Sequence, residues 1–211
     1  MKPKVVLVVL DGARESNKND DLACSEVRRI IQNEISWNCD LLTDFADRNL
    51  GCAKRVSRGI SWVFSHVEEA VILEDYCIPS LDFFQYSTEL LERYRDNESV
   101  FSICARNFGN LENDKSYTFS KYTNIWGWAS WRRAWKYYDY ELKSLNSQSE
   151  KIIAQKIGYW KTSLIWLSRF YYLQKSQKKY TWDFQWVFSS LLHGGLSALP
   201  QHCLAENIGF N

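Results

Sequence analysis

Apolar positions in the first half of the chain alternate between two periodicities. Four short apolar runs, rich in β-branched residues, are typical of strands buried on both faces; they cover residues 5–10, 39–43, 70–73 and 100–104. Between them, apolar residues recur every three or four positions, as on one face of a helix; these stretches cover residues 21–35, 49–67 and 80–94. Strands that alternate with helices predict βαβ units and a mostly parallel sheet flanked by helices.

The pattern changes after residue 105 and predicts an aromatic-rich, helical C-terminal part. Residues 125–135 are dense in tryptophan, and residues 149–174 have helical and aromatic character. A further helix is expected over 182–192 and a late strand over 196–199. No internal repeat or low-complexity linker divides the chain, so we expect one domain.

Composition narrows the class of protein. The 211 residues are 45% hydrophobic, enough for one domain with a real core. With 26 basic and 25 acidic residues, the net charge of +1 offers no electrostatic reason to expect nucleic acid as a partner. The six cysteines show no CxxC pair, which argues against a zinc site and indicates a reduced, cytoplasmic compartment. Lys161 and Arg169 interrupt the apolar stretch 159–173, which therefore cannot span a bilayer, although contact with a membrane surface stays open.

Ten tryptophans and twelve tyrosines have two interpretations. They can form a large aromatic core, or they can line a carbohydrate site, because the flat C–H faces of sugars pack on aromatic rings. Composition alone favours the core.

Polar groups follow three of the predicted strands or the turns next to them. Asp11 and Gly12 follow the first strand, Asn49–Gly51 come after the second, and Glu74 and Asp75 close the third. Ligands of open α/β sheets bind beyond the carboxyl ends of the strands. Each group alone is equally well explained by turn formation; together they are expected to line one edge of the sheet.

Two acidic positions suggest specific chemistry. Glu74 and Asp75 could hold a divalent cation, Mn²⁺ or Mg²⁺, that bridges the phosphates of a sugar nucleotide and stabilises the departing diphosphate. The alternative is that they cap the next helix and pair with an arginine. Asp183 is expected in the first turn of a helix, where the dipole alone favours an acid. The sharper hypothesis makes Asp183 a general base whose pKa is raised by its tryptophan neighbours.

Six segments, in the right order and spread over nearly the whole chain, carry a family resemblance. They are Asn49–Cys52, Gly59–Phe64, Val71–Pro79 with Phe83–Phe84, Ile125–Trp135, Trp182–Trp186 and Asn207–Phe210. These segments resemble bacterial glycosyltransferases of the GT-A (Rossmann-like) fold, distantly similar to the inverting N-acetylglucosaminyltransferase I type. The resemblance implies a single GT-A-like domain over 1–211, with residues 1–105 binding the nucleotide sugar and residues 106–211 on the acceptor side.

The resemblance also implies roles for individual residues. Asp11 and Gly12 would contact the uracil or ribose of a UDP-sugar. The remaining donor-binding residues implied are Arg14, Asn49, Gly51, Arg55, Glu74 and Asp75, with Asp75 as metal ligand. Asp183 would be the catalytic base, and Trp126, Trp128 and Trp182 would shape the sugar and acceptor pocket. For Trp126 and Trp128 a core role outweighs direct contact.

Two departures from the family pattern bear on these roles. Tyr76 stands where the family has the last acid of its metal motif, and a phenol is a poor replacement for a carboxylate at neutral pH. The chain also starts at what resembles the family's second strand. A sheet without its first strand would expose an edge, which makes a homodimer one expectation.

Three functions are compatible with these features. The favoured one is an inverting glycosyltransferase that moves a sugar from a nucleotide diphosphate to a saccharide or lipid-linked acceptor in bacterial polysaccharide or glycolipid synthesis. It would act in the cytoplasm or at the inner face of the membrane. The second is a non-catalytic relative of the same fold that acts as a binding protein. A nucleotidyltransferase has less support, because no Gly-rich basic phosphate loop lies near the N-terminus.

Overall fold

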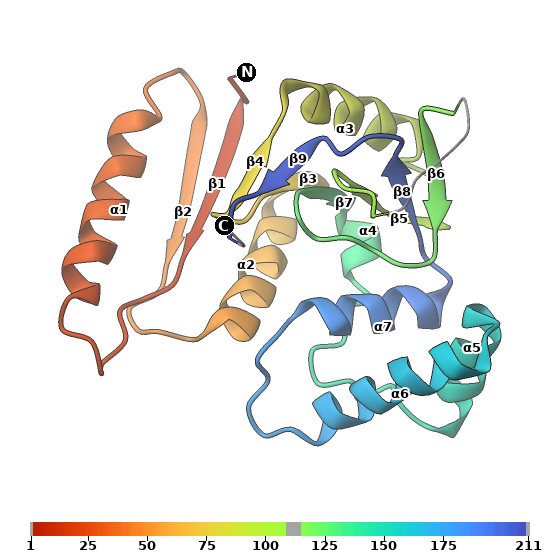
Figure 1. Cartoon of the computed structure of the whole chain (residues 1–211). Helices are drawn as coiled ribbons and strands as arrows, with labels where there is room; N and C mark the ends of the chain where they lie inside the picture. Colours follow the sequence, from red (N-terminus) through yellow and green to blue (C-terminus); the bar gives the residue numbers. More distant parts are fainter. Residues whose placement is uncertain (1, 109–114, 210–211) are drawn as a thin grey trace. The chain divides into compact units, whose positions relative to one another are not determined.

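The chain forms two compact units, and Figure 1 shows the helices and strands from which they are built. The computed structural model describes residues 2–108 and 115–209. The first unit comprises Met1–Val63 and Lys179–Trp182, and the second comprises Phe64–Lys178 and Asp183–Asn211. Phe210, which closes the last segment of the family resemblance, lies outside the described residues.

The first unit contains the βαβ arrangement that the sequence predicts. β1 (Val5–Leu10) and β2 (Asp40–Phe45) are parallel, and α1 (Asp20–Glu34) connects them. α2 (Cys52–His66) follows β2 and packs closely on β1. A Cβ atom on Gly59 would lie 2.5 Å from Cγ1 of Val9, so only glycine allows this approach.

The second unit is built on a mixed five-stranded sheet with the order β3-β7-β5-β8-β6. Its strands are β3 (Glu69–Ile72), β5 (Val100–Cys104), β6 (Tyr117–Ser120), β7 (Trp128–Trp131) and β8 (Leu196–Pro200). Two further strands, β4 (Cys77–Pro79) and β9 (Ala205–Asn207), form a separate antiparallel pair.

The expectation of a mostly parallel sheet is wrong. β7 lies between β3 and β5 and runs antiparallel to both, and β6 runs antiparallel to β8. Among the described strands only β1–β2 and β5–β8 are parallel pairs. The prediction failed because the sequence analysis did not recognise Trp128–Trp131 as a strand. Its four residues are all buried, and it forms the strand between β3 and β5. These four residues, Trp-Ala-Ser-Trp, are too few to show a periodicity that would mark them as a central strand. The chain is an α/β protein, as expected, with mixed sheets.

Local sequence signals explain where the helices of the second unit begin and end. They are α3 (Leu81–Arg93), α4 (Arg132–Trp135), α5 (Ser147–Ile157), α6 (Trp160–Lys175) and α7 (Asp183–His193). The Ser80 side chain accepts a hydrogen bond from the Phe83 amide and caps α3, as predicted from its sequence. Gly158, at φ +76°, ends α5 and divides the expected 149–174 segment into two helices.

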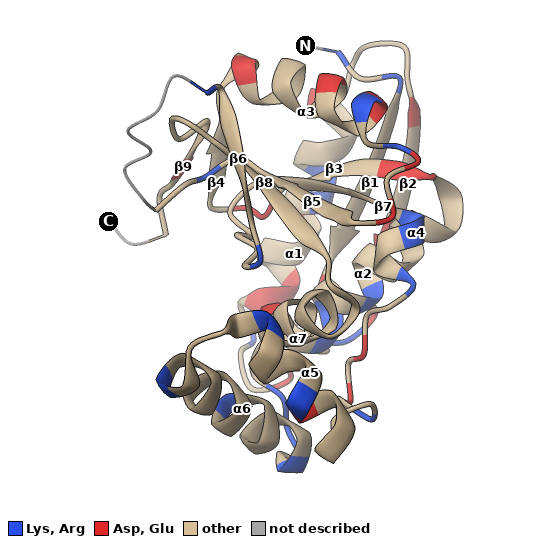
Figure 2. Cartoon of the chain, turned by 90° about the vertical axis from the view of Figure 1, so that its right-hand side faces the viewer, with Lys and Arg blue, Asp and Glu red and all other residues tan. Residues whose placement is uncertain are grey.

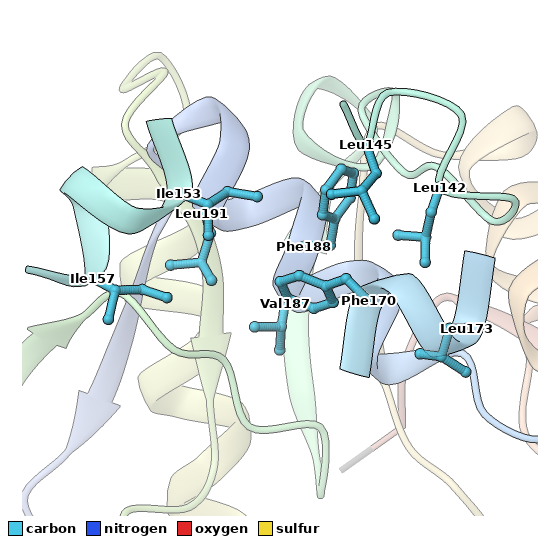
Figure 3. Close-up of a cluster of buried hydrophobic side chains, with 9 residues drawn as sticks. All are labelled: Leu142, Leu145, Ile153, Ile157, Phe170, Leu173, Val187, Phe188 and Leu191. Atoms are coloured by element: carbon cyan, nitrogen blue, oxygen red, sulfur yellow. The ribbon is translucent and has the colours of Figure 1, made fainter. Parts of the chain in front are cut away.

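Several apolar clusters hold the second unit together, and two of them position α7. One joins α5, α6 and α7 through nine buried side chains (Figure 3): Leu142, Leu145, Ile153, Ile157, Phe170, Leu173, Val187, Phe188 and Leu191. The other is aromatic and joins α7 to the sheet. Trp186 packs on Phe101, Trp128 and Trp135 with ring centroids 5.1–5.9 Å apart, and its Nε1 donates a hydrogen bond to Ser102 Oγ at 3.2 Å. These contacts fix the helix that begins at Asp183 against β5.

Candidate functional site

Asp11, at the carboxyl end of β1, anchors the loop that leads into α2. Its Oδ1 accepts hydrogen bonds from the Gly12 and Leu50 amides at 2.9 and 2.8 Å. Its Oδ2 accepts one from the Gly51 amide at 3.0 Å. Both carboxylate oxygens therefore hold backbone, and the shape of the loop at 48–51 depends on this side chain.

Gly12, Asn49 and Gly51 complete this loop. A Cβ on Gly12 would lie 2.5 Å from the Arg48 carbonyl carbon, so the two backbone segments can meet only at a glycine. Asn49 Nδ2 donates to the Gly12 carbonyl at 3.0 Å, and the Asn49 amide donates to the Ala13 carbonyl. Gly51 adopts φ +78°, which turns the chain into α2. The structure thus brings these three predicted residues together with Asp11.

The two arginines predicted to bind the donor have different surroundings. Arg55 is buried, forms an ion pair with Asp44 at 2.9 Å and donates to the Asp44 carbonyl, so its guanidinium ties α2 to β2. Arg14 is exposed and forms a two-point ion pair with Asp20, at 2.6 and 3.0 Å. The Arg14 guanidinium lowers the pKa of Asp20.

A shallow hollow of about 500 Å³ opens beside this loop. Eight residues line it: Ala13, Arg14, Glu15, Ser16, Arg48, Asn49, Leu50 and Lys54. Three of them are cationic and one is acidic, which makes the hollow suited to an anion. The expected residues Arg14 and Asn49 line it, whereas Gly51 and Arg55 do not.

The sequence analysis missed Arg48 and Lys54, although one signal could have found Lys54. The first turn of α2 contains Lys54 and Arg55 and no acid. A helix N-terminus favours acidic side chains and disfavours cations. Cations placed there against the dipole indicate a bound anion or an internal ion pair; Arg55 has the ion pair, and Lys54 faces the hollow.

In the second unit, Glu74, Asp75 and Tyr76 form the turn between β3 and β4. The Cys77 amide donates to the Glu74 carbonyl at 2.9 Å, and Asp75 is exposed at the tip. The Tyr76 carbonyl accepts a hydrogen bond from the Ile208 amide, and the Tyr76 side chain lies against Gly209. Burial raises the pKa of the neighbouring Cys77 thiol. Residues 2–108 and 115–209 contain no cluster of three His, Cys, Asp or Glu side chains arranged for a metal ion, and the cation at Asp75 stays a prediction.

An arginine that the sequence analysis missed lies near the start of β7. The guanidinium of Arg106, two residues beyond the end of β5, stacks over the rings of Trp126 and Phe108, with distances of 5.1 and 5.5 Å to the ring centroids. The Ala105 amide donates to the Gly127 carbonyl and holds these segments together. Trp126 is only partly buried, so its face can contribute to a binding surface.

Two of the tryptophans expected in the sugar pocket are buried. Trp128 has no exposed surface and packs between Trp135 and Trp186, which makes it part of the core. Trp182 is 2% exposed. Neither ring offers a face to a ligand in this structure, so of the three only Trp126 is placed for contact.

Asp183 is the first residue of α7, three residues before the anchored Trp186. Burial raises the pKa of its carboxyl, and hydrogen bonds from its own amide and from the Phe184 amide partly oppose this rise. An acid with a raised pKa is a better proton acceptor when ionised. Asp11 belongs to the first unit, whereas Asp75 and Asp183 belong to the second, and the convergence of the three on one cleft stays a prediction.

No known family model and no curated protein sequence matches this chain. The resemblance to GT-A glycosyltransferases therefore rests on the six segments of the sequence alone.

Proposed function

We propose that this chain is a glycosyltransferase of GT-A type that binds a nucleotide-diphosphate sugar and transfers the sugar to an acceptor hydroxyl. The observation that carries the proposal is the hollow in the first unit. Arg14, Arg48 and Lys54 line it beside the carboxyl end of β1, where ligands of α/β sheets bind. A diphosphate is the part of a sugar nucleotide that such a set of cations would recognise.

Asp183 is the group we assign to the chemistry. Its ionised carboxylate takes the proton of the acceptor hydroxyl, and the oxygen attacks the anomeric carbon of the donor. The bond from that carbon to the phosphate oxygen breaks, and the nucleoside diphosphate leaves with the electron pair. Attack opposite the leaving group inverts the anomeric configuration. Burial of Asp183 supports this role because it raises the carboxyl pKa towards the working range of a general base.

The fit of a divalent cation depends on Asp75 and Tyr76. Asp75 is exposed and offers a carboxylate, whereas Tyr76 provides only a phenol at the position of the family's direct ligand. A bound Mn²⁺ or Mg²⁺ would stabilise negative charge on the departing diphosphate. The cations of the hollow could do the same without a metal, so we expect donor binding to depend only weakly on Mn²⁺.

Calorimetric titration with UDP and UDP-sugars, with and without Mn²⁺, tests donor binding. We expect Arg48→Ala and Lys54→Ala each to weaken UDP binding roughly tenfold, the effect of losing one charge-assisted hydrogen bond. Arg58→Ala is the matched control, because Arg58 is an exposed cation one helical turn after Lys54 and lies outside the hollow. Absence of UDP binding under both conditions would refute the proposal.

Transfer is tested separately from binding. Asp183→Asn should lower turnover by about 10²–10⁴-fold and leave the affinity for UDP unchanged. Unchanged turnover would remove Asp183 from the mechanism. Donor binding without transfer to any acceptor would favour the second function, a non-catalytic relative, which the tyrosine at position 76 supports. In that case Tyr76→Asp should introduce a dependence on Mn²⁺.

A further inference from the structure

The segment 143–178 differs from the rest of the chain in its charge. It contains seven basic side chains and a single acid, Glu150, although the whole chain has 26 basic and 25 acidic residues. Glu150 accepts a hydrogen bond from the Tyr171 hydroxyl, which partly occupies this one acid. Figure 2 shows the basic positions distributed along α5 and α6. This helical pair therefore carries a strong local positive charge on a nearly neutral protein.

The two faces of α6 have different surroundings. Phe170 and Leu173 point into the cluster shared with α5 and α7 (Figure 3). On the other face, four large apolar side chains are more than half exposed: Trp160 at 68%, Leu164 at 58%, Ile165 at 53% and Tyr172 at 63%. A helix that is apolar on both faces is normally buried on both. The outer face of α6 thus lacks a covering among the described residues.

Cations are interleaved with this exposed apolar face. Lys161 and Lys175 share the helix surface with Trp160, Leu164 and Tyr172, and α6 contains no acid. Next to it, an apolar hollow of about 470 Å³ opens between α5 and α6, lined in part by Trp160, Leu164 and Leu167. Exposed tryptophan and leucine side chains with basic side chains beside them also occur on helices that lie in a membrane interface.

We infer that the outer face of α6 docks on an anionic lipid bilayer, with Trp160, Leu164 and Ile165 inserted among the acyl chains and the lysines beside the headgroups. None of the described helices has the length and apolar content needed to cross a membrane, so the contact inferred is at the interface. This inference does not depend on the transfer reaction and would stand if the chain bound no nucleotide sugar.

Charge and side-chain type favour a bilayer over two other occupants. A second copy of the same face would bring two sets of cations together, which is unfavourable. Nucleic acid would match the charge, but the aliphatic side chains of Leu164 and Ile165 cannot stack on bases as aromatic rings do. Acyl chains accept both the aliphatic and the aromatic side chains, and anionic headgroups satisfy the lysines.

Vesicle co-sedimentation of the full chain tests the inference. We expect binding to phosphatidylcholine vesicles that contain about a third phosphatidylglycerol, with at least tenfold weaker binding to pure phosphatidylcholine, because each basic residue near an anionic surface contributes roughly fivefold. The same contribution predicts that Lys161→Gln with Lys175→Gln weakens binding roughly 25-fold. Leu164→Glu should weaken vesicle binding at least tenfold, because the variant loses the burial of a leucine side chain among the acyl chains.

Matched controls separate this face from general effects of charge and polarity. Lys2→Gln with Lys4→Gln removes the same charge from exposed lysines in the first unit, and Leu81→Glu alters an exposed leucine on α3. Both controls should bind vesicles like the wild type, and circular dichroism verifies that every variant is folded. Equal binding to neutral and anionic vesicles would overturn the inference, as would variants at α6 that bind like the wild type. It is equally overturned if the wild type does not sediment with anionic vesicles. Dimerisation or binding of a single-stranded oligonucleotide through this face would then identify the other occupant.

Discussion

Replacing Asp11 by alanine should loosen the loop at 48–51 and should do so by a measurable amount. The carboxylate accepts three backbone hydrogen bonds, from Gly12, Leu50 and Gly51, at 2.8–3.0 Å. A hydrogen bond contributes about 1 kcal/mol net, and more when one partner is charged. Because Asp11 is only partly buried, water can replace some of the loss, and we take about 1 kcal/mol for each bond. If the loop opens as one piece, Asp11→Ala costs about 3 kcal/mol.

Native-state amide hydrogen exchange measures this local opening. A loss of about 3 kcal/mol makes the exchange of the Leu50 and Gly51 amides about 100-fold faster. The amides of β5 in the second unit should be unchanged. Asp11→Asn gives a finer test. Asparagine has a single carboxamide oxygen, which can accept hydrogen bonds either from the Gly12 and Leu50 amides or from the Gly51 amide. Either the Leu50 or the Gly51 amide then faces an NH₂ group and exchanges faster than the other.

Asp47→Ala is the matched control, since Asp47 is an exposed aspartate in the loop that follows β2. It should leave the exchange of both amides unchanged. Equal exchange rates in Asp11→Ala and wild type would show that the carboxylate does not hold this loop. The reasoning would fail equally if the control accelerated exchange as much.

Three further outcomes are expected. Gly12→Ala should destabilise the first unit by about 1–3 kcal/mol in urea unfolding, because its Cβ would lie 2.5 Å from the Arg48 carbonyl carbon; a neutral effect would contradict the backbone contact. Asp183→Asn should raise the melting temperature at pH 7. Burial raises the carboxyl pKa of Asp183 in the folded state above its value in the unfolded chain. The wild type therefore loses stability as the pH rises from about 4 through the folded-state pKa, whereas asparagine does not ionise. If the stability advantage of Asp183→Asn over the wild type shrank with rising pH, the inferred direction of the pKa shift would be wrong. At pH 8, iodoacetamide should label the exposed Cys52 and Cys203 well before Cys104, since burial raises the pKa of the Cys104 thiol to about 11. Mass spectrometry measures the labelling of each cysteine. Rapid labelling of Cys104 would show that its surroundings open.

Local patterns located most of the regular structure. The run Val5–Leu10 is β1 residue for residue, and Val100–Cys104 is β5. Ser80 caps α3 as its side-chain chemistry predicts. These features could be predicted because each depends on a few neighbouring residues, on a long enough apolar run or on a side chain that satisfies an amide nearby.

The same patterns could not give the direction or order of strands in the sheet. Trp128–Trp131 runs antiparallel between β3 and β5 because its partners lie far away in the sequence. A similar limit applies to side-chain roles. Asp11 and Arg55 were expected to bind a donor, and the structure engages Asp11 with the loop amides and Arg55 with Asp44.

The sequence by itself determined the sites of most helices and strands and the acids and cations available for chemistry, because these depend on residue type and short-range spacing. Only the tertiary structure decided how those groups are used. It grouped Arg48 and Lys54 around one hollow, buried Trp128, and left the outer face of α6 exposed. The physical reason is that burial, ion pairing and exposure are set by residues that meet in space, and spacing along the chain does not encode those meetings.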